Sequence, residues 1–190
     1  MKKNTILYIG VSGHRDLKQS EIPHYQQQVH QILSRIVAEH PDRDVRILSP
    51  LADGADRLVV QVGRELGLEY EALLPLPSSL YEQDFSPDSL EAYRQLLSGA
   101  RVPPRVIPWG EGCTAENCAE YGEHRDRQYR LVGEAVVDQS EQMIFLWDGV
   151  RNHLVGGTAA IHTYAQASYP KRPETKIFWV KCAREQSAKK

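Results

Sequence analysis

Cysteine is scarce in this sequence, and the few thiols form no recognisable framework. Three cysteines occur among the 190 residues: Cys113, Cys118 and Cys182. An odd number without regular spacing argues against a disulfide-stabilised secreted domain and favours a reducing, cytoplasmic setting. Cys113 and Cys118 lie near His124, but they form no Cys-x-x-Cys pair and a fourth ligand is missing. We therefore expect ordinary loop thiols and no metal site.

Long hydrophobic runs and an excess of positive charge are missing too. No segment approaches the roughly 20 apolar residues of a membrane-spanning helix, and the first apolar run is too short for a secretory signal, so we expect no contact with a membrane. The formal net charge is −2. Since proteins that follow a nucleic-acid backbone usually carry a basic excess, we do not expect nucleic acid as a partner. One small anion needs only a few local charges, which this balance permits.

What the sequence does contain is a regular alternation of strand-like and helix-like stretches, without an internal repeat. Strands are predicted at Thr5–Val11, Val45–Leu48, Tyr70–Leu74, Arg105–Ile107, Gln142–Trp147 and Lys176–Val180. Helices are predicted over Pro23–His40, Asp53–Leu66, Pro87–Leu97, Tyr121–Gln139 and Thr158–Ala167. This order predicts one α/β domain over residues 1–182, with a doubly wound, mostly parallel, Rossmann-like sheet of about six strands and helices on both faces. Residues 183–190 are expected to form a frayed tail.

The end of the first strand carries the first candidate site. In doubly wound sheets, ligands bind beyond the carboxyl ends of the strands. The first strand runs into Gly10, Val11, Ser12, Gly13, His14 and Arg15, which is neither a G-x-G-x-x-G fingerprint nor a P-loop. The two glycines allow close approach to a ligand, and successive N–H groups in such a turn form an anion-binding concavity. Arg15 can clamp phosphate oxygens, and His14 can bond a phosphate, hydroxyl or base. The alternative is a tight turn whose arginine pairs with Asp16.

Further candidates follow the second and third predicted strands. Gly54 and Asp56 open the second helix. Capping alone explains Asp53 and Asp56, whereas the functional alternative is that one of them binds ribose hydroxyls or orients the arginine of the first turn. The proline-rich segment Leu74–Phe85 is either a stiff connector or a pocket wall. Arg125, in the first turns of the helix expected over Tyr121–Gln139, either contacts a ligand or belongs to a solvated face.

The strongest late strand leads to the second candidate corner. Asp148 follows the strand, and Gly156, Gly157 and Thr158 open the next helix. Glycines and a threonine at a helix N-terminus expose backbone donors at the positive end of the helix dipole. The alternative is a glycine-rich turn with a threonine cap. If both corners belong to one site, they converge to form a single seat for an anion.

These ordered motifs resemble the SLOG superfamily of Rossmann-like domains, which includes DNA-processing protein A and the "Lonely Guy" phosphoribohydrolases. The similarity rests on S-G-H-R after the first strand, G-A-D after the second, and L-W-D-G with G-G-T-A near the end. It implies a nucleotide or nucleotide-derived ligand, and no cofactor beyond such a ligand. It assigns ligand contact to the following positions: Gly10, Ser12, Gly13, His14, Arg15, Gly54, Asp56, Asp148, Gly156, Gly157 and Thr158. It also allows a homo-oligomer.

One departure from the family bears on catalysis. The phosphoribohydrolases have a motif of the form P-G-G-x-G-T-x-x-E, whose glutamate takes part in cleaving the N-glycosidic bond. Matching Gly157 and Thr158 to its G-T places Ile161 where that glutamate stands. We therefore expect a non-catalytic module that binds a nucleotide-type phosphorylated ligand as a sensor or carrier. The alternative is an enzyme that hydrolyses or transfers at an N-glycosidic bond, with His14 as acid or base and another carboxylate from this set: Asp53, Asp56, Asp84 and Asp148.

Overall fold

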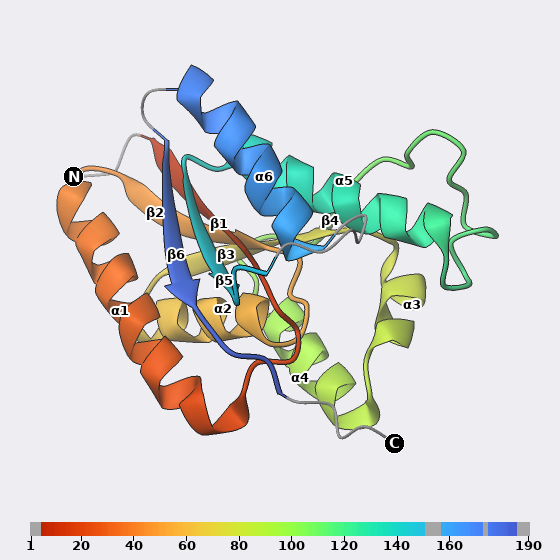
Figure 1. Ribbon diagram of the computed structural model, residues 1–190, viewed down its shortest axis with the longest axis horizontal. Coiled ribbons are helices and arrows are strands. Elements are labelled where there is room, and N and C mark those ends of the chain that lie inside the picture. The colour runs from red at the N-terminus through yellow and green to blue at the C-terminus, as the bar shows by residue number, and fades with distance from the viewer. Residues whose placement is uncertain (1–4, 151–156, 173–174, 186–190) are drawn as a thin grey trace.

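The computed structural model describes residues 5–150, 157–172 and 175–185, in which strands and helices alternate (Figure 1). The strands are β1 (Ile6–Gly13), β2 (Asp44–Ser49), β3 (Glu69–Leu74), β4 (Arg105–Val106), β5 (Gln142–Trp147) and β6 (Lys176–Lys181). The α-helices are α1 (Ile22–Glu39), α2 (Ala55–Glu65), α3 (Ser78–Tyr81), α4 (Pro87–Ser98), α5 (Glu123–Gln139) and α6 (Thr158–Ser168). Short 3₁₀ turns are η1 (Gln19–Glu21), η2 (Glu82–Asp84) and η3 (Tyr169–Lys171).

The strands form one parallel sheet in the order β4-β3-β2-β1-β5-β6. The chain builds outward from β1 to β4 and then returns to place β5 on the other side of β1. The strand order therefore reverses between β1 and β5, which is the position where ligands bind in sheets of this kind. The predicted doubly wound, Rossmann-like α/β class is confirmed.

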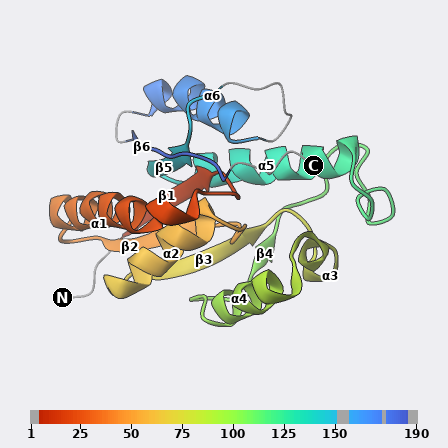
Figure 2. The same cartoon turned by 60° about the horizontal axis from the view of Figure 1, so that its bottom comes forward.

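Helices cover the sheet on two faces: α5 and α6, in the upper part of Figure 2, pack on one, and α1, α2 and α4 pack on the other. One buried cluster joins Leu7 and Ile9 of β1 to Leu33 of α1 and Tyr93 of α4. A second cluster joins β5 to α5 and α6 through side chains such as Phe145, with no exposed area. Strands covered on both faces need continuous apolar sequence, which is the pattern that β1 and β5 show.

Most predicted boundaries agree with the structure to within about two residues. Ser86 caps α4 as expected from its place before Pro87, and its hydroxyl accepts the N–H of Ser89.

Two details differ from the predicted elements. Asp53 does not cap α2, because Gly54 with its positive φ of 72° occupies the cap position. The segment expected as a connector or wall contains the short helix α3 and turn η2.

Contacts at the C-terminal end involve residues expected in the frayed tail. The N–H of Glu185 donates to the carbonyl of Asp16 over 2.7 Å. The guanidinium of Arg184 lies 3.0 Å from the carboxylate of the same aspartate. Residues 183–185 thus lie against the connection that follows β1. None of the helices in the described ranges is long and apolar enough to cross a bilayer.

Candidate functional site

A small pocket lies at the carboxyl ends of β1, β2 and β3, and residues of both predicted corners line it. Its volume is about 100 Å³. The residues that line it are Val11, Ser12, Gly13, Arg15, Pro50, Ala52, Asp56, Pro75, Tyr81, Tyr129, Val132, Gly133, Thr158 and Ile161. Five of these were predicted as ligand contacts from sequence: Ser12, Gly13, Arg15, Asp56 and Thr158. The corners after β1 and before α6 therefore converge on one site.

The turn after β1 is fixed against the start of α2. The N–H of Ala55 donates to the carbonyl of His14 over 3.0 Å. A β-carbon on Gly54 would overlap the carbonyl oxygens of His14 and Arg15. Gly54 is therefore needed for this close approach as well as for its positive φ. It positions the turn and does not line the pocket.

The two glycines of the first turn also have packing roles. A β-carbon on Gly10 would meet Met143, Ser140 and Val136, so this glycine lets β1 pack against α5 and β5. A β-carbon on Gly13 would overlap Ala55 and the carbonyl of Leu146. Gly13 still lines the pocket, whereas Gly10 lies beneath it.

Arg15 brings a cation to the pocket and is held there by Asp84. Both terminal nitrogens of Arg15 lie 3.4 Å from Oδ2 of Asp84. The side chain of Arg15 is 43% exposed and that of Asp84 only 1%. The guanidinium carbon also lies 5.5 Å from the ring centre of Tyr129, which lines the pocket. These contacts aim the arginine at the site without covering it.

Arg125 supports this arrangement from outside the pocket. Its guanidinium donates to the carbonyls of Cys118 and Leu80 over 2.6 and 2.9 Å, and to the hydroxyl of Tyr129 over 2.6 Å. It also pairs with Asp84 at 2.7 Å. The whole side chain is buried. Arg125 is thus engaged within the protein, and we assign it the role of holding Asp84 and Tyr129 in place.

Asp56 is the acidic group of the pocket. It is 5% exposed, and its Oδ2 accepts the N–H of Ala52 over 3.2 Å. Burial raises the pKa of Asp56 to about 7, although the Ala52 N–H and the charges of Arg15 and Arg57 act in the opposite direction. Near neutral pH, the carboxyl group is therefore protonated in a large fraction of the molecules. In that form it can donate a hydrogen bond to an anion.

His14 and Asp148 bond each other at the ends of β1 and β5. Nε2 of His14 lies 3.1 Å from Oδ1 of Asp148, and the N–H of Asp148 is 3.2 Å from the same ring nitrogen. Burial alone would raise the pKa of Asp148, but hydrogen bonds from the Val150 N–H and His14 hold it below its ordinary value. The pair ties the two strand ends together beside the pocket.

The N-terminus of α6 closes the other side of the pocket. Gly157 occupies the cap position, so the cap residue has no side chain to bond the first N–H groups of α6. The first N–H groups of a helix have no partner within the helix, so the start of α6 offers donors beside Thr158. Ile161, at the position matched to the family glutamate, also lines the pocket. Gly156 lies outside the described residues.

Sequence reasoning missed Tyr81 and Tyr129 as pocket residues. Tyr81 belongs to α3, in the segment expected as either a connector or a pocket wall, and is buried. Tyr129 lies one turn after Arg125, and its hydroxyl donates to Oδ2 of Asp84 over 2.7 Å. The four-residue spacing of Arg125 and Tyr129 indicated a shared face, but not which partner that face meets.

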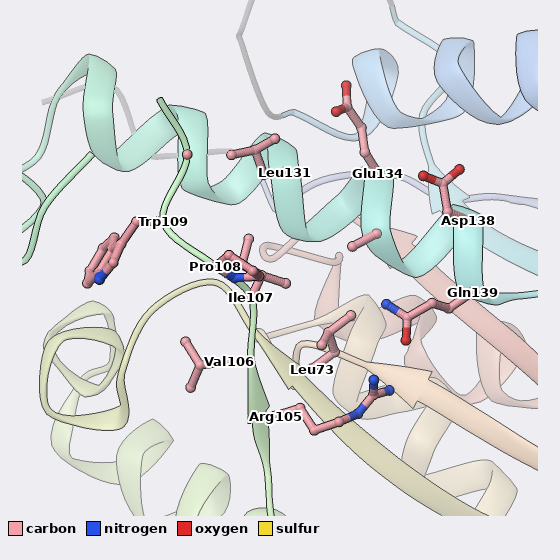
Figure 3. Close-up of a pocket in the computed structure, with 12 residues that line it drawn as sticks. Leu73, Arg105, Val106, Ile107, Pro108, Trp109, Leu131, Glu134, Asp138 and Gln139 are labelled. Carbon is pink, nitrogen blue, oxygen red and sulfur yellow. The ribbon is translucent and has the colours of Figure 1, made fainter. Parts of the chain in front are cut away.

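A larger groove lies away from the predicted residues, between β3, β4 and α5 (Figure 3). Its volume is about 770 Å³, and it is lined by apolar side chains such as Leu73 and Trp109, with Glu134 and Asp138 on its helical wall. None of the predicted site residues lines it. Among the residues that the structure describes, no group of three or more His, Cys, Asp or Glu side chains is arranged to hold a metal ion.

Comparison with known proteins identifies relatives by fold. No protein-family model matches the sequence, and no curated protein matches it. DNA processing protein A from Streptococcus pneumoniae superposes with a TM-score of 0.47 and 11% identity, over 90% of this chain and 58% of that one. DNA processing protein A from Helicobacter pylori, described as binding single-stranded DNA, gives 0.46 and 12%, over 92% and 76%.

At 11% and 12% identity, these matches show a similar Rossmann-like fold and nothing beyond the fold. They also correct one expectation. We did not expect nucleic acid as a partner, and this is wrong: one of the matched proteins is described as binding single-stranded DNA. The expectation rested on net charge, which is a sum over the whole chain and does not describe the charge at any one site.

Proposed function

We propose that the pocket at the ends of β1, β2 and β3 binds the phosphate group of a nucleotide or nucleotide-derived molecule, as a sensor or carrier without turnover. One observation carries the proposal. Three segments that are distant in the chain line a single pocket, next to the strand at which the order reverses. They contribute Ser12 and Arg15 at the end of β1, Asp56 at the start of α2, and Thr158 at the start of α6.

The charges around the pocket suit a small anion. Arg15 supplies a cation, and the start of α6 supplies backbone donors with the positive end of the helix dipole behind them. Asp56, with a pKa of about 7, adds a donor when protonated and so repels the anion little. A volume of about 100 Å³ is below the roughly 300–1,000 Å³ of pockets that enclose whole ligands. The phosphate group therefore enters, and the rest of the ligand stays outside.

The alternative, cleavage at an N-glycosidic bond, is not favoured. Ile161 lines the pocket at the position where the family resemblance places a glutamate, and an alkyl side chain cannot activate water. Of the four acids considered for that role, Asp56 lines the pocket. The others are bonded elsewhere: Asp53 to Arg57 and Ser89, Asp84 to Arg125 and Tyr129, and Asp148 to His14.

Thermal unfolding with inorganic phosphate, nucleoside monophosphates and a short single-stranded oligonucleotide tests the proposal. A ligand at about 100 times its Kd stabilises the native state by about 2.7 kcal/mol, which raises Tm by roughly 5–10 °C for a chain of this size. Arg15→Ala should abolish the shift. Arg101→Ala is the matched control, because Arg101 is similarly exposed and pairs with Glu69 at the start of β3, away from the pocket. No shift with any of these ligands, or equal shifts in Arg15→Ala and wild type, would refute the proposal.

A further inference from the structure

Tyr121 presents an exposed aromatic ring that two internal contacts hold in place. The residue is 72% exposed, yet its hydroxyl donates to Oδ1 of Asp84 over 3.2 Å. The guanidinium carbon of Arg125 lies 5.1 Å from the ring centre. Isolated exposed aromatic residues are ordinary. Tyr121 is held by Asp84 at its hydroxyl and by Arg125 over its ring, and both of these side chains are buried. Its side chain has therefore lost much of its conformational freedom before a ligand binds.

The same carboxylate joins this ring to the anion pocket. Oδ1 of Asp84 accepts from Tyr121, whereas Oδ2 accepts from Arg15 at 3.4 Å. Tyr129, whose ring lies 5.5 Å from the guanidinium carbon of Arg15, donates its hydroxyl to the same carboxylate. An exposed ring and the cation of the pocket are therefore neighbours, although they come from distant parts of the chain.

A nucleotide has the two parts that such an arrangement recognises. The pocket of about 100 Å³ accommodates a phosphate group and leaves the base outside. We propose that the base of the nucleotide stacks on the ring of Tyr121, and this inference rests on the proposed phosphate site. The site would then bind nucleotides more tightly than sugar phosphates. The bound unit is a free nucleotide or one nucleotide of a single strand, since stacking on an aromatic face accepts any base.

Calorimetric titrations of the full chain separate the parts of this proposal. The ligands are inorganic phosphate, ribose 5-phosphate, adenosine 5′-monophosphate, a short oligothymidylate and an abasic oligomer of equal length. Wild type should bind the base-containing ligand about 5- to 150-fold more tightly than its base-free counterpart, the range given by base–aromatic stacking. A preference with the mononucleotide supports a free ligand, and a preference with the oligomer alone supports a single strand.

Three variants locate the base. Tyr121→Ala should remove the preference while leaving the affinity for phosphate and its thermal unfolding close to wild type, because the ring is largely exposed. Tyr121→Phe retains the ring and should keep most of the preference. Trp109→Ala, which changes an exposed aromatic residue of the large groove, should keep all of it.

The failures are distinguishable. If no ligand binds wild type, the phosphate site itself is wrong. If phosphate and sugar phosphate bind, but a base adds nothing, the phosphate site stands and the role of Tyr121 is refuted. Loss of the preference in Trp109→Ala and not in Tyr121→Ala would place the base in the large groove and also overturn the inference.

Discussion

The titration of Asp56 gives the sharpest prediction for stability, and the variant Asp56→Asn tests it. The carboxyl is buried against Ala52 and the pocket, and its pKa is raised from 3.8 to about 7. Each pKa unit corresponds to about 1.36 kcal/mol, so the folded protein holds this proton more tightly than the unfolded chain by about 4 kcal/mol.

The direction of the pKa shift determines how stability changes with pH. A carboxyl with a raised pKa in the folded state contributes stability that is complete below about pH 4 and is lost as pH rises to about 7. Asparagine does not titrate. The free energy of unfolding of wild type relative to Asp56→Asn should therefore fall by about 1.4 kcal/mol per pH unit up to about pH 7, and then level off.

Urea unfolding at about pH 5, 6, 7 and 8 measures this slope. Asp88→Asn is the matched control, because Asp88 occupies the same second position of α4 but is exposed. Any change in the strength of the hydrogen bond from the Ala52 N–H shifts the Asp56→Asn curve by a constant and leaves its slope unchanged. Parallel curves for wild type and Asp56→Asn across this range would refute the reasoning.

Three further predictions follow from the same contacts. Arg125→Met should lower the free energy of unfolding by about 3–5 kcal/mol in urea titrations, because it leaves Asp84 buried with a missing partner; an effect below about 1 kcal/mol would show that the pair is dispensable. Gly54→Ala should destabilise the protein by more than Gly67→Ala, since both have positive φ but only a β-carbon on Gly54 meets backbone; equal losses would contradict the close-approach role. If Asp56 faces the bound phosphate, phosphate affinity should weaken above about pH 7 in wild type relative to Asp56→Asn, and calorimetry that finds the same pH profile for both would refute the contact.

The sequence determined the fold through local signals. Apolar stretches such as Gln142–Trp147 must be buried on two faces, and caps such as Ser86 mark where helices begin. These signals act between residues close in the chain, so they can be recognised without coordinates. Alternation of strands and helices then leaves few arrangements besides a doubly wound parallel sheet. The strand ends were located for the same reason, and with them Ser12, Arg15, Asp56 and Thr158.

Only the tertiary structure decided which of the candidate residues are used inside the protein. Gly10 and Gly54 were expected to admit a ligand, but they admit the protein's own side chains and backbone. Arg125 was a candidate contact, yet its donors are used by Leu80, Cys118, Tyr129 and Asp84. A motif specifies the residue types at a corner, whereas burial and pairing depend on segments distant in the chain. Asp84 was named from sequence only as a candidate acid, and its contacts with Arg15, Tyr121 and Arg125 depend on the folded chain.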